Sequence, residues 1–205
     1  MGTSFVEPLE ARALLSAALG AADYSPVGAV LPEATVRQEV VVRSEPAGTR
    51  AAQKFEVRFM TRMIDHHHMA VMMGEMAAQK AVHPELRQLG EAIVSAQTQE
   101  IQQMQGWLQS WYGVAYEARM KPGEERRMDR MEAMSGEEFE VAFMKQMVRH
   151  HWKAILMSRQ ALRRAEHQEL LGTADAIVAA QTQEIRQMQT WLRDWYGIER
   201  FGPRV

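Results

Sequence analysis

The chain has 205 residues and a formal net charge of −2, with 24 Lys and Arg against 26 Asp and Glu. This balance, without a strongly basic stretch, argues against a nucleic-acid partner. Cysteine is absent, which excludes disulfides and thiolate ligands and fits an oxidising compartment. No run of about 18 apolar residues occurs, so we expect no membrane-spanning helix.

Residues 1–50 differ from the rest of the chain. They hold four of the seven prolines and show little helical periodicity beyond residue 20. We expect an N-terminal targeting segment or extended arm. Residues 5–17 read FVEPLEARALLSA. They resemble the LEPR-x-LL type N-terminal segment of planctomycete exported or surface proteins, which implies a location outside the cytoplasm.

The remaining chain contains a gap-free repeat. Residues 55–113 align with 139–197 at an offset of 84, and 32 of 59 positions are identical. A repeat of this length predicts a duplicated helical hairpin rather than a solenoid. The expected fold class is all-α, a four-helix bundle built from two hairpins, with the extended N-terminal arm added.

Periodicity and turn residues place the helices in chain order. The first covers about 50–81, and His83-Pro84 separates it from the second, which ends near residue 112. A short helix is predicted over 124–134. Ser135 and Glu138 predict a capping box for the fourth helix, which ends near 165, and the fifth covers about 168–196.

Four segments follow from these predicted helices. They are an N-terminal segment (1–50), a first hairpin (51–113), a connector with a short helix (114–138) and a second hairpin (139–199). The two hairpins and the connector are expected to form one bundle domain over 51–199.

Histidine and glutamate fall on the predicted apolar stripes. At about 100° per residue, His67 lies near the centre of the first helix's stripe, with His66 and Met73 at one edge. Glu100 lies near the centre of the second helix's stripe. An unpaired carboxylate is costly to bury, so Glu100 must be paired, protonated or bound to a metal.

Two interpretations of this pattern remain open. His67 and Glu100, with His151 and Glu184 in the second copy, are either structural pairs that fix the register of the bundle or parts of a metal site. The two are compatible, because a carboxylate also orients a metal-bound imidazole. The edge histidines His66 and His150, with Met73 and Met157 beside them, are the favoured copper ligands.

Ligand chemistry selects among metals. Imidazole and thioether groups, without thiolates and with few carboxylates, favour Cu(I) over Mg, Ca or Mn. Zinc is less favoured because methionine is a poor zinc ligand. Iron is also less favoured, because a di-iron site needs a Glu three residues before a His on two helices. Neither doublet has one.

The first copy reads Phe59-x3-Met63-x2-His66-His67-x2-Ala70-x2-Met73, then Ile93-x3-Gln97-x2-Glu100-Ile101-x2-Met104. This pattern, repeated in the second copy, resembles the DUF305 family. The resemblance covers both repeats and implies a ferritin-like bundle that binds, buffers or sequesters copper outside the cytoplasm. Carried over by position, the metal ligands that it implies are Met63, His66, His67, Met73, Glu100, Met104, Met147, His150, His151, Met157, Glu184 and Met188.

The copies differ on one face of the first helix, which we expect to be exposed. That face is either an accessory metal site that captures and releases Cu(I), or a contact with the N-terminal arm or another subunit. Its residues in the first copy, replaced by Trp152, Lys153, Leu156 and Gln160 in the second, are His68, Met69, Met72 and Met76.

Three further groups have structural interpretations. The connector methionines Met128, Met131 and Met134, with Met120 upstream, are expected to dock on the bundle in preference to forming a transporter-like methionine cluster. His83 and His167 are expected to cap or turn the chain between helices. Four tryptophans and two tyrosines are expected to close the bundle ends, with the tyrosine hydroxyls toward water: Trp107, Trp111, Trp191, Trp195, Tyr112 and Tyr196.

The favoured function is therefore copper binding, buffering or sequestration outside the cytoplasm, without enzymatic activity. The alternatives are a helical interaction module with a structural polar network and, less favoured, a metal-dependent oxidase. The expected partner is a metal ion. A homo-oligomer and a copper-handling partner protein both remain open.

Overall fold

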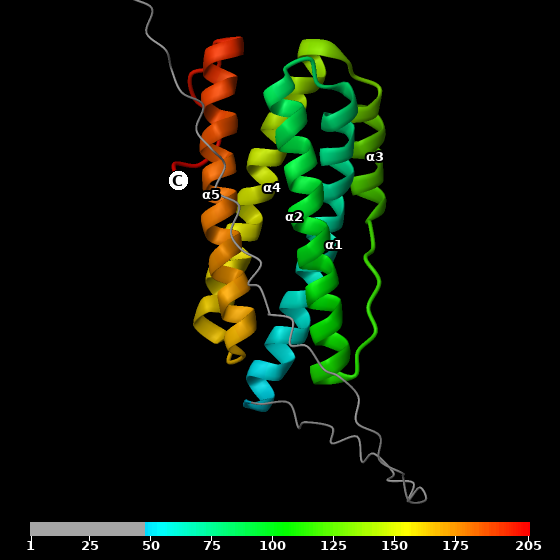
Figure 1. The fold of residues 1–205 in the computed structure, drawn as a ribbon, viewed down its shortest axis with the longest axis vertical. Helices are drawn as coiled ribbons and strands as arrows, with labels where there is room; N and C mark the ends of the chain where they lie inside the picture. The colour runs from blue at the N-terminus through cyan, green and yellow to red at the C-terminus, as the bar shows by residue number, and fades with distance from the viewer. Residues whose placement is uncertain (1–47) are drawn as a thin grey trace, which may run out of the picture. The chain divides into compact units, whose positions relative to one another are not determined.

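The computed structural model describes residues 48–205, which form a bundle of α-helices. In chain order these are α1 (Arg50–Lys80), α2 (Pro84–Tyr112), α3 (Pro122–Glu132), α4 (Gly136–Arg164) and α5 (Gln168–Tyr196). The four long helices run side by side, and the short α3 lies along their flank (Figure 1). The all-α fold class is confirmed. The expected N-terminal arm lies outside the described residues.

Local sequence signals explain the helix ends. The Thr49 side chain caps α1 by accepting a hydrogen bond from the Ala52 N–H at 3.2 Å. Pro84 opens α2 at a position where the missing N–H costs nothing. Gly113 and Gly197 end α2 and α5 with φ of 65° and 63°, values that favour glycine.

Two predicted boundaries are corrected. The short helix covers 122–132 rather than 124–134, because Pro122 occupies its first turn and Glu124 accepts from the Lys121 N–H at 2.9 Å. Ser135 is the N-cap residue of α4, but its side chain makes no capping hydrogen bond. The predicted capping box is therefore absent.

The two hairpins meet through their first helices. α1 packs on α2 and α4 on α5, as the short turns predict, and α1 also packs directly on α4. Paired phenylalanine rings mark the same level in both copies, Phe55 with Phe59 and Phe139 with Phe143. The α1–α4 contact therefore joins the two hairpins into one bundle.

The methionine-rich face of α1 is covered rather than exposed. Met128 and Met131 of α3 are buried, at 4% and 6% exposure, in the same core cluster as Met69. Met72 and Met76 pack partly buried against that cluster. The docking of the connector helix is thus confirmed, and the expected exposure of this face is wrong because α3 lies over it.

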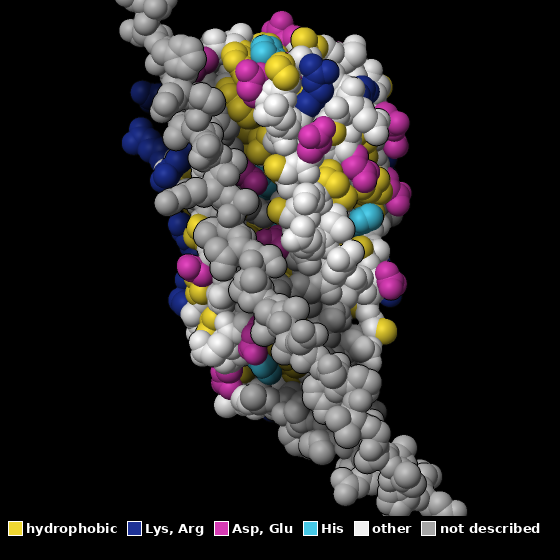
Figure 2. All heavy atoms as spheres, viewed as in Figure 1, with side chains coloured by type: hydrophobic (Ala, Val, Ile, Leu, Met, Phe, Trp, Pro, Cys, Tyr) yellow, Lys and Arg dark blue, Asp and Glu magenta, His cyan; other side chains and the backbone are white. Residues whose placement is uncertain are grey.

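Side chains of both charges share the face seen in Figure 2 with small groups of hydrophobic side chains. Among the described residues, no helix is long and apolar enough to cross a membrane.

A glycine pair brings α1 and α2 into close contact. A Cβ atom added at Gly90 would lie 2.7 Å from the Gly74 carbonyl oxygen, and one at Gly74 would lie 2.8 Å from the Gly90 carbonyl oxygen. The second copy carries Ser158 and Ala174 instead. The first hairpin is therefore held by a close backbone contact that depends on both glycines.

A buried carboxylate locks each hairpin to the other. Glu56 of α1 is 1% exposed and accepts from the N–H groups of Glu166 and His167, at 2.6 and 3.1 Å, where α5 begins. Its second oxygen lies 2.6 Å from His167 Nδ1 and accepts a hydrogen bond from the Tyr112 hydroxyl. The His167 ring stacks on Trp111 at 4.0 Å.

The second copy repeats this lock in the opposite direction. Glu140 of α4 accepts from the N–H groups of Val82 and His83, at 2.6 and 2.8 Å, and from the Tyr196 hydroxyl. His83 and His167 are the N-cap residues of α2 and α5, so their predicted turn role is confirmed. The expectation that the tyrosine hydroxyls face water is wrong, because each donates to a buried carboxylate.

These locks shift the pKa of their carboxyl groups. Burial alone would raise the pKa of Glu56. The hydrogen bonds from Tyr112, from two backbone N–H groups and from His167 outweigh it and lower the pKa below its ordinary value. The pKa of Glu140 is lowered by the matching set of partners. Both locks therefore require ionised carboxylates.

The glycine contact predicts opposite effects for two Gly→Ala substitutions in α2. Gly90→Ala should lower the free energy of unfolding by about 1–3 kcal/mol, because the methyl group meets backbone atoms. Gly106→Ala should raise it by up to about 1 kcal/mol, because nothing lies within 4 Å and alanine favours helix. Denaturant unfolding monitored by circular dichroism measures both. Equal effects would contradict the close contact.

The locks predict a pH dependence of stability. A carboxylate whose pKa is lowered by folding stabilises the protein above its ordinary pKa of 4.5 and loses that contribution as the pH falls through the folded value. Glu56→Gln should therefore cost on the order of 1–3 kcal/mol at pH 7, and the difference from wild type should shrink below pH 4.5. Glu91→Gln, at an exposed position of α2, is the matched control. A difference that stays constant with pH would contradict the assignment.

Candidate metal centre

Four histidines meet where α1 crosses α4. The rings of His66 and His150, from different hairpins, stack with centroids 3.5 Å apart and an interplanar angle of 30°. Within each doublet the adjacent rings lie 6.3 Å apart, His66 from His67 and His150 from His151. The two copies thus bring their doublets together about an approximate two-fold axis between His66 and His150.

These histidines are buried without hydrogen-bond partners. His67 and His151 have no exposed surface, and His150 is 2% exposed. Both ring nitrogens of all four histidines are shielded from solvent and have no hydrogen-bond partner. Buried polar atoms are almost always hydrogen-bonded, and six of these eight nitrogens, all but Nε2 of His67 and of His151, contact no carboxylate either. They are free for a ligand, although among the described residues no three His, Asp or Glu side chains are already arranged to hold a metal ion.

Burial lowers the pKa of His66 and of His150 well below the ordinary value, and neighbouring histidines and Lys153 lower it further. The His150 backbone acts in the opposite sense on His66 but lies outside hydrogen-bonding geometry. Both rings are therefore neutral at pH 7, which is the form that binds a metal ion.

A glutamate approaches each inner histidine. Glu100 Oε2 lies 2.7 Å from His67 Nε2, and Glu184 Oε2 lies 2.5 Å from His151 Nε2. In both pairs the N–H···O angle is too far from linear for a hydrogen bond, so each is a close contact between the ring and the carboxylate. By contrast, the 2.7 Å contact of His83 with Glu140 has hydrogen-bond geometry.

The pairing of each inner histidine with a glutamate is confirmed, but the position of the glutamates differs from the prediction. Side chains Glu100 and Glu184 keep 23% and 22% of their surface exposed. They lie at the edge of the core rather than near its centre. The fully buried carboxylates are Glu56 and Glu140, which form the locks.

The methionines form two groups that cross between hairpins. Met63 and Met104 of the first hairpin share a core cluster with Met157 of the second packed against it. The equivalent residues of the second hairpin share the other cluster with Met73 of the first. Five of these six methionines are fully buried, and Met157 is half-buried. The centre is therefore built by both hairpins together.

Exposure separates the two edge histidines, His66 and His150, whose place at the edge of the apolar stripe predicts that both can be reached from outside. His66 is half-buried, whereas His150 is buried. The expected access to His150 is wrong because its ring lies under His66. In the accessory set, Met69 is buried and His68, Met72 and Met76 are half-buried. An accessory metal site there stays a prediction.

Sequence reasoning missed Glu56 and Glu140. Both are identical between the copies, in the pair Phe-Glu at the start of each repeat. The predicted site was built on the His, Met and later Glu positions and did not include Glu56 or Glu140. A charged residue kept between copies on an otherwise apolar stripe was the available signal.

Known proteins share this fold. The profile of the family described as a domain of unknown function (DUF305) matches residues 56–192. The structure of CopM in its Cu(I)-bound form is 34% identical, with a TM-score of 0.63, and the match covers 69% of this chain and 98% of that one. CopM in its Cu(II)-bound form matches at the same identity and score, over 97% of its chain.

A DUF305 fragment from Deinococcus radiodurans is 26% identical, with a TM-score of 0.61, over 69% of this chain and 97% of that one. A DUF305 protein from Streptomyces coelicolor, described as a candidate secreted protein, shares the fold at 23% identity, with a TM-score of 0.60, over 68% of this chain and 91% of that one. No curated protein matches the chain. The family profile spans both hairpins and both histidine doublets, and the chain belongs to the DUF305 family.

Proposed function

We propose that this protein binds monovalent copper between its hairpins and buffers or sequesters it outside the cytoplasm. The ligands would come from the two histidine doublets and the methionines and glutamates around them. The metal is the protein's cargo, and the proposal assigns it no reaction.

The unpartnered nitrogens carry the proposal. A polar group buried without a hydrogen bond costs about 1–3 kcal/mol, and this site holds six nitrogens that have neither a hydrogen bond nor a carboxylate contact. A metal ion would convert several of them from a cost into bonds. A site maintained only for packing would be more stable with apolar side chains.

The surrounding atoms favour a soft, monovalent ion. Neutral imidazoles and thioethers are the ligands that Cu(I) prefers, and they carry no charge to balance a second positive charge on the metal. Glu100 and Glu184 supply one negative charge per doublet near the inner histidines. That arrangement suits a low-charge cation in a site closed to bulk water.

The comparisons support this reading. CopM is described in Cu(I)-bound, Cu(II)-bound and Ag-bound forms, and each match covers 69% of this chain. The extracytoplasmic location rests on the resemblance of the N-terminal segment and on the family member described as a candidate secreted protein.

Anaerobic titration with Cu(I) against a competing chelator tests the proposal. The wild-type protein should bind Cu(I) with a sub-micromolar dissociation constant. Met63→Leu should weaken binding about tenfold, equivalent to about 1.4 kcal/mol, because a thioether is lost at nearly constant volume. Met60→Leu is the matched control, since Met60 is also fully buried on α1 and lies outside the proposed ligand set.

Wild-type protein that binds no tighter than micromolar would refute copper binding and favour the structural module. Sustained oxygen consumption by the Cu(I)-loaded protein would favour the oxidase.

The stability of the metal-free protein separates the copper site from the structural alternative. If the doublets serve a metal, His150→Leu should raise the free energy of unfolding of the metal-free protein by about 1 kcal/mol, because it removes two unpartnered buried nitrogens. His83→Leu should lower it, because the His83 ring contacts Glu140 in hydrogen-bond geometry. Urea unfolding in the presence of a chelator measures both. A loss of stability in His150→Leu would show that the doublets serve packing.

A further inference from the structure

A cavity of about 220 Å³ opens beside the outer histidine of the first doublet. His66 and Met69 of α1 and Met157 of α4 line it. Its rim consists of four charged residues, two basic and two acidic, namely Arg62, Asp65, Lys121 and Glu124. Two thioethers and an imidazole therefore lie at one opening whose rim carries no net charge.

The connector fixes one wall of this cavity. The Asp65 carboxylate accepts from the Tyr116 hydroxyl at 3.0 and 2.9 Å and from the Arg119 N–H at 2.9 Å. Asp65 is thus occupied in holding the segment between α2 and α3. The neutral His66, Met69 and Met157 remain as the groups able to bind an incoming soft ion.

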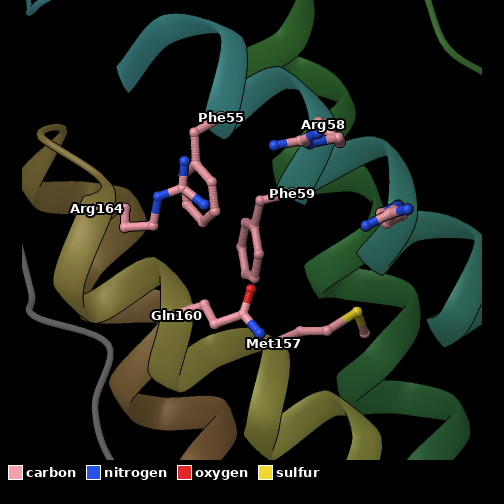
Figure 3. Close-up of a pocket in the computed structure, with 7 residues that line it drawn as sticks. Phe55, Arg58, Phe59, Met157, Gln160 and Arg164 are labelled. Carbon is pink, nitrogen blue, oxygen red and sulfur yellow. The ribbon is translucent and has the colours of Figure 1, made fainter. Parts of the chain in front are cut away.

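The cavity continues along the groove between α1 and α4. Met157 and Arg62 also line a second, smaller cavity, of about 50 Å³, whose other lining residues include Phe55 and Arg164. Figure 3 shows Met157 reaching from α4 across the groove, with its sulfur directed toward α1. The smaller space accommodates little more than one water molecule, so the larger cavity offers more room for a donor that delivers the ion.

His66 connects this cavity to the buried centre. Its ring lines the cavity on one side and stacks on His150 on the other. Its nitrogens have no hydrogen bond to break before they bind a ligand. An ion held by His66 is one ligand exchange away from the other doublet.

The second copy lacks these features. At the offset of 84, Arg149 replaces Asp65 and Lys153 replaces Met69. Met73, the counterpart of Met157, is fully buried. The C-terminal tail lies against this face, where the Arg149 guanidinium lies 4.7 Å from the centre of the Phe201 ring, and Gln189 holds the Phe201 carbonyl at 2.7 Å.

We propose that the cavity at His66, Met69 and Met157 is the entry site for the metal and that copper reaches the centre from this face alone. The inference rests on the proposed copper-binding function. The thioethers of Met69 and Met157 replace the donor's ligands on Cu(I), and the His66 imidazole then replaces one of these two thioethers. One metal–sulfur bond breaks as one metal–nitrogen bond forms, and nothing is oxidised or reduced.

Charge explains why copper would enter at one face and not at the other. Thioethers are neutral, soft ligands, and at the same position in the second copy Lys153 adds a positive charge that repels an incoming cation. Lys153 is exposed, whereas Met69, its counterpart in the first copy, is buried. The divergence at Met69 and Lys153 therefore divides the duplicated protein into an entry face and a closed face.

Loading kinetics test the entry site separately from binding. Metal-free protein is mixed anaerobically with Cu(I) held by a chromogenic chelator, and the transfer rate and final stoichiometry are both recorded. Met69→Lys, which installs the residue of the second copy, should slow loading about tenfold at unchanged stoichiometry. Met69→Leu should slow it less, because it removes the thioether without adding charge. Met128→Leu, in the same core cluster but outside the cavity, should load like wild type.

Unchanged rates in both Met69 variants, at full stoichiometry, would overturn the entry site and leave the copper-binding function intact. Wild-type protein that takes up no Cu(I) would instead overturn the proposed function. If circular dichroism shows that Met69→Lys is unfolded, Met69→Leu decides the question, because leucine preserves the packing volume.

Discussion

The stacking of His66 on His150 is the contact around which the bundle is organised. It places two polar rings face to face where the hairpins cross, with His150 buried and His66 half-buried. Neither ring has a hydrogen bond to offset its burial. The arrangement is unfavourable by itself, so the rest of the bundle must hold the two hairpins in this register.

The two carboxylate locks do that. Each joins the start of one hairpin to the turn of the other, and each combines two backbone N–H donors with a tyrosine hydroxyl and a histidine ring. Glu56 and Glu140 are far along the helices from the doublets, so they determine the crossing of α1 and α4 without touching the centre. Stability and ligand binding thus lie in different residues of the same repeat.

The sequence predicted the parts of this arrangement that follow from periodicity. The repeat, the hairpins and the pairing of His67 with Glu100 all depend on helical spacing and on short turns. The stack of His66 on His150 could not be predicted, because projection of one helix gives a face but not the rotation of one hairpin against the other. The burial of the Tyr112 hydroxyl was missed for the same reason, since its partner Glu56 also binds the opposite hairpin.

The position of the connector helix α3 was the other feature that the sequence did not predict. The methionines of α1 beyond the core stripe looked exposed because the projection held only the four long helices, and α3 lies over them. This cover also changes what the first copy can do. Met72 and Met76 are half-buried against the core cluster that includes α3, while Met69 is buried and lines a cavity with His66. A duplicated hairpin begins with two equivalent faces, and a connector on one and a C-terminal tail on the other make them different. The proposed centre is shared by both hairpins, while the proposed access to it depends on residues that only one copy retains.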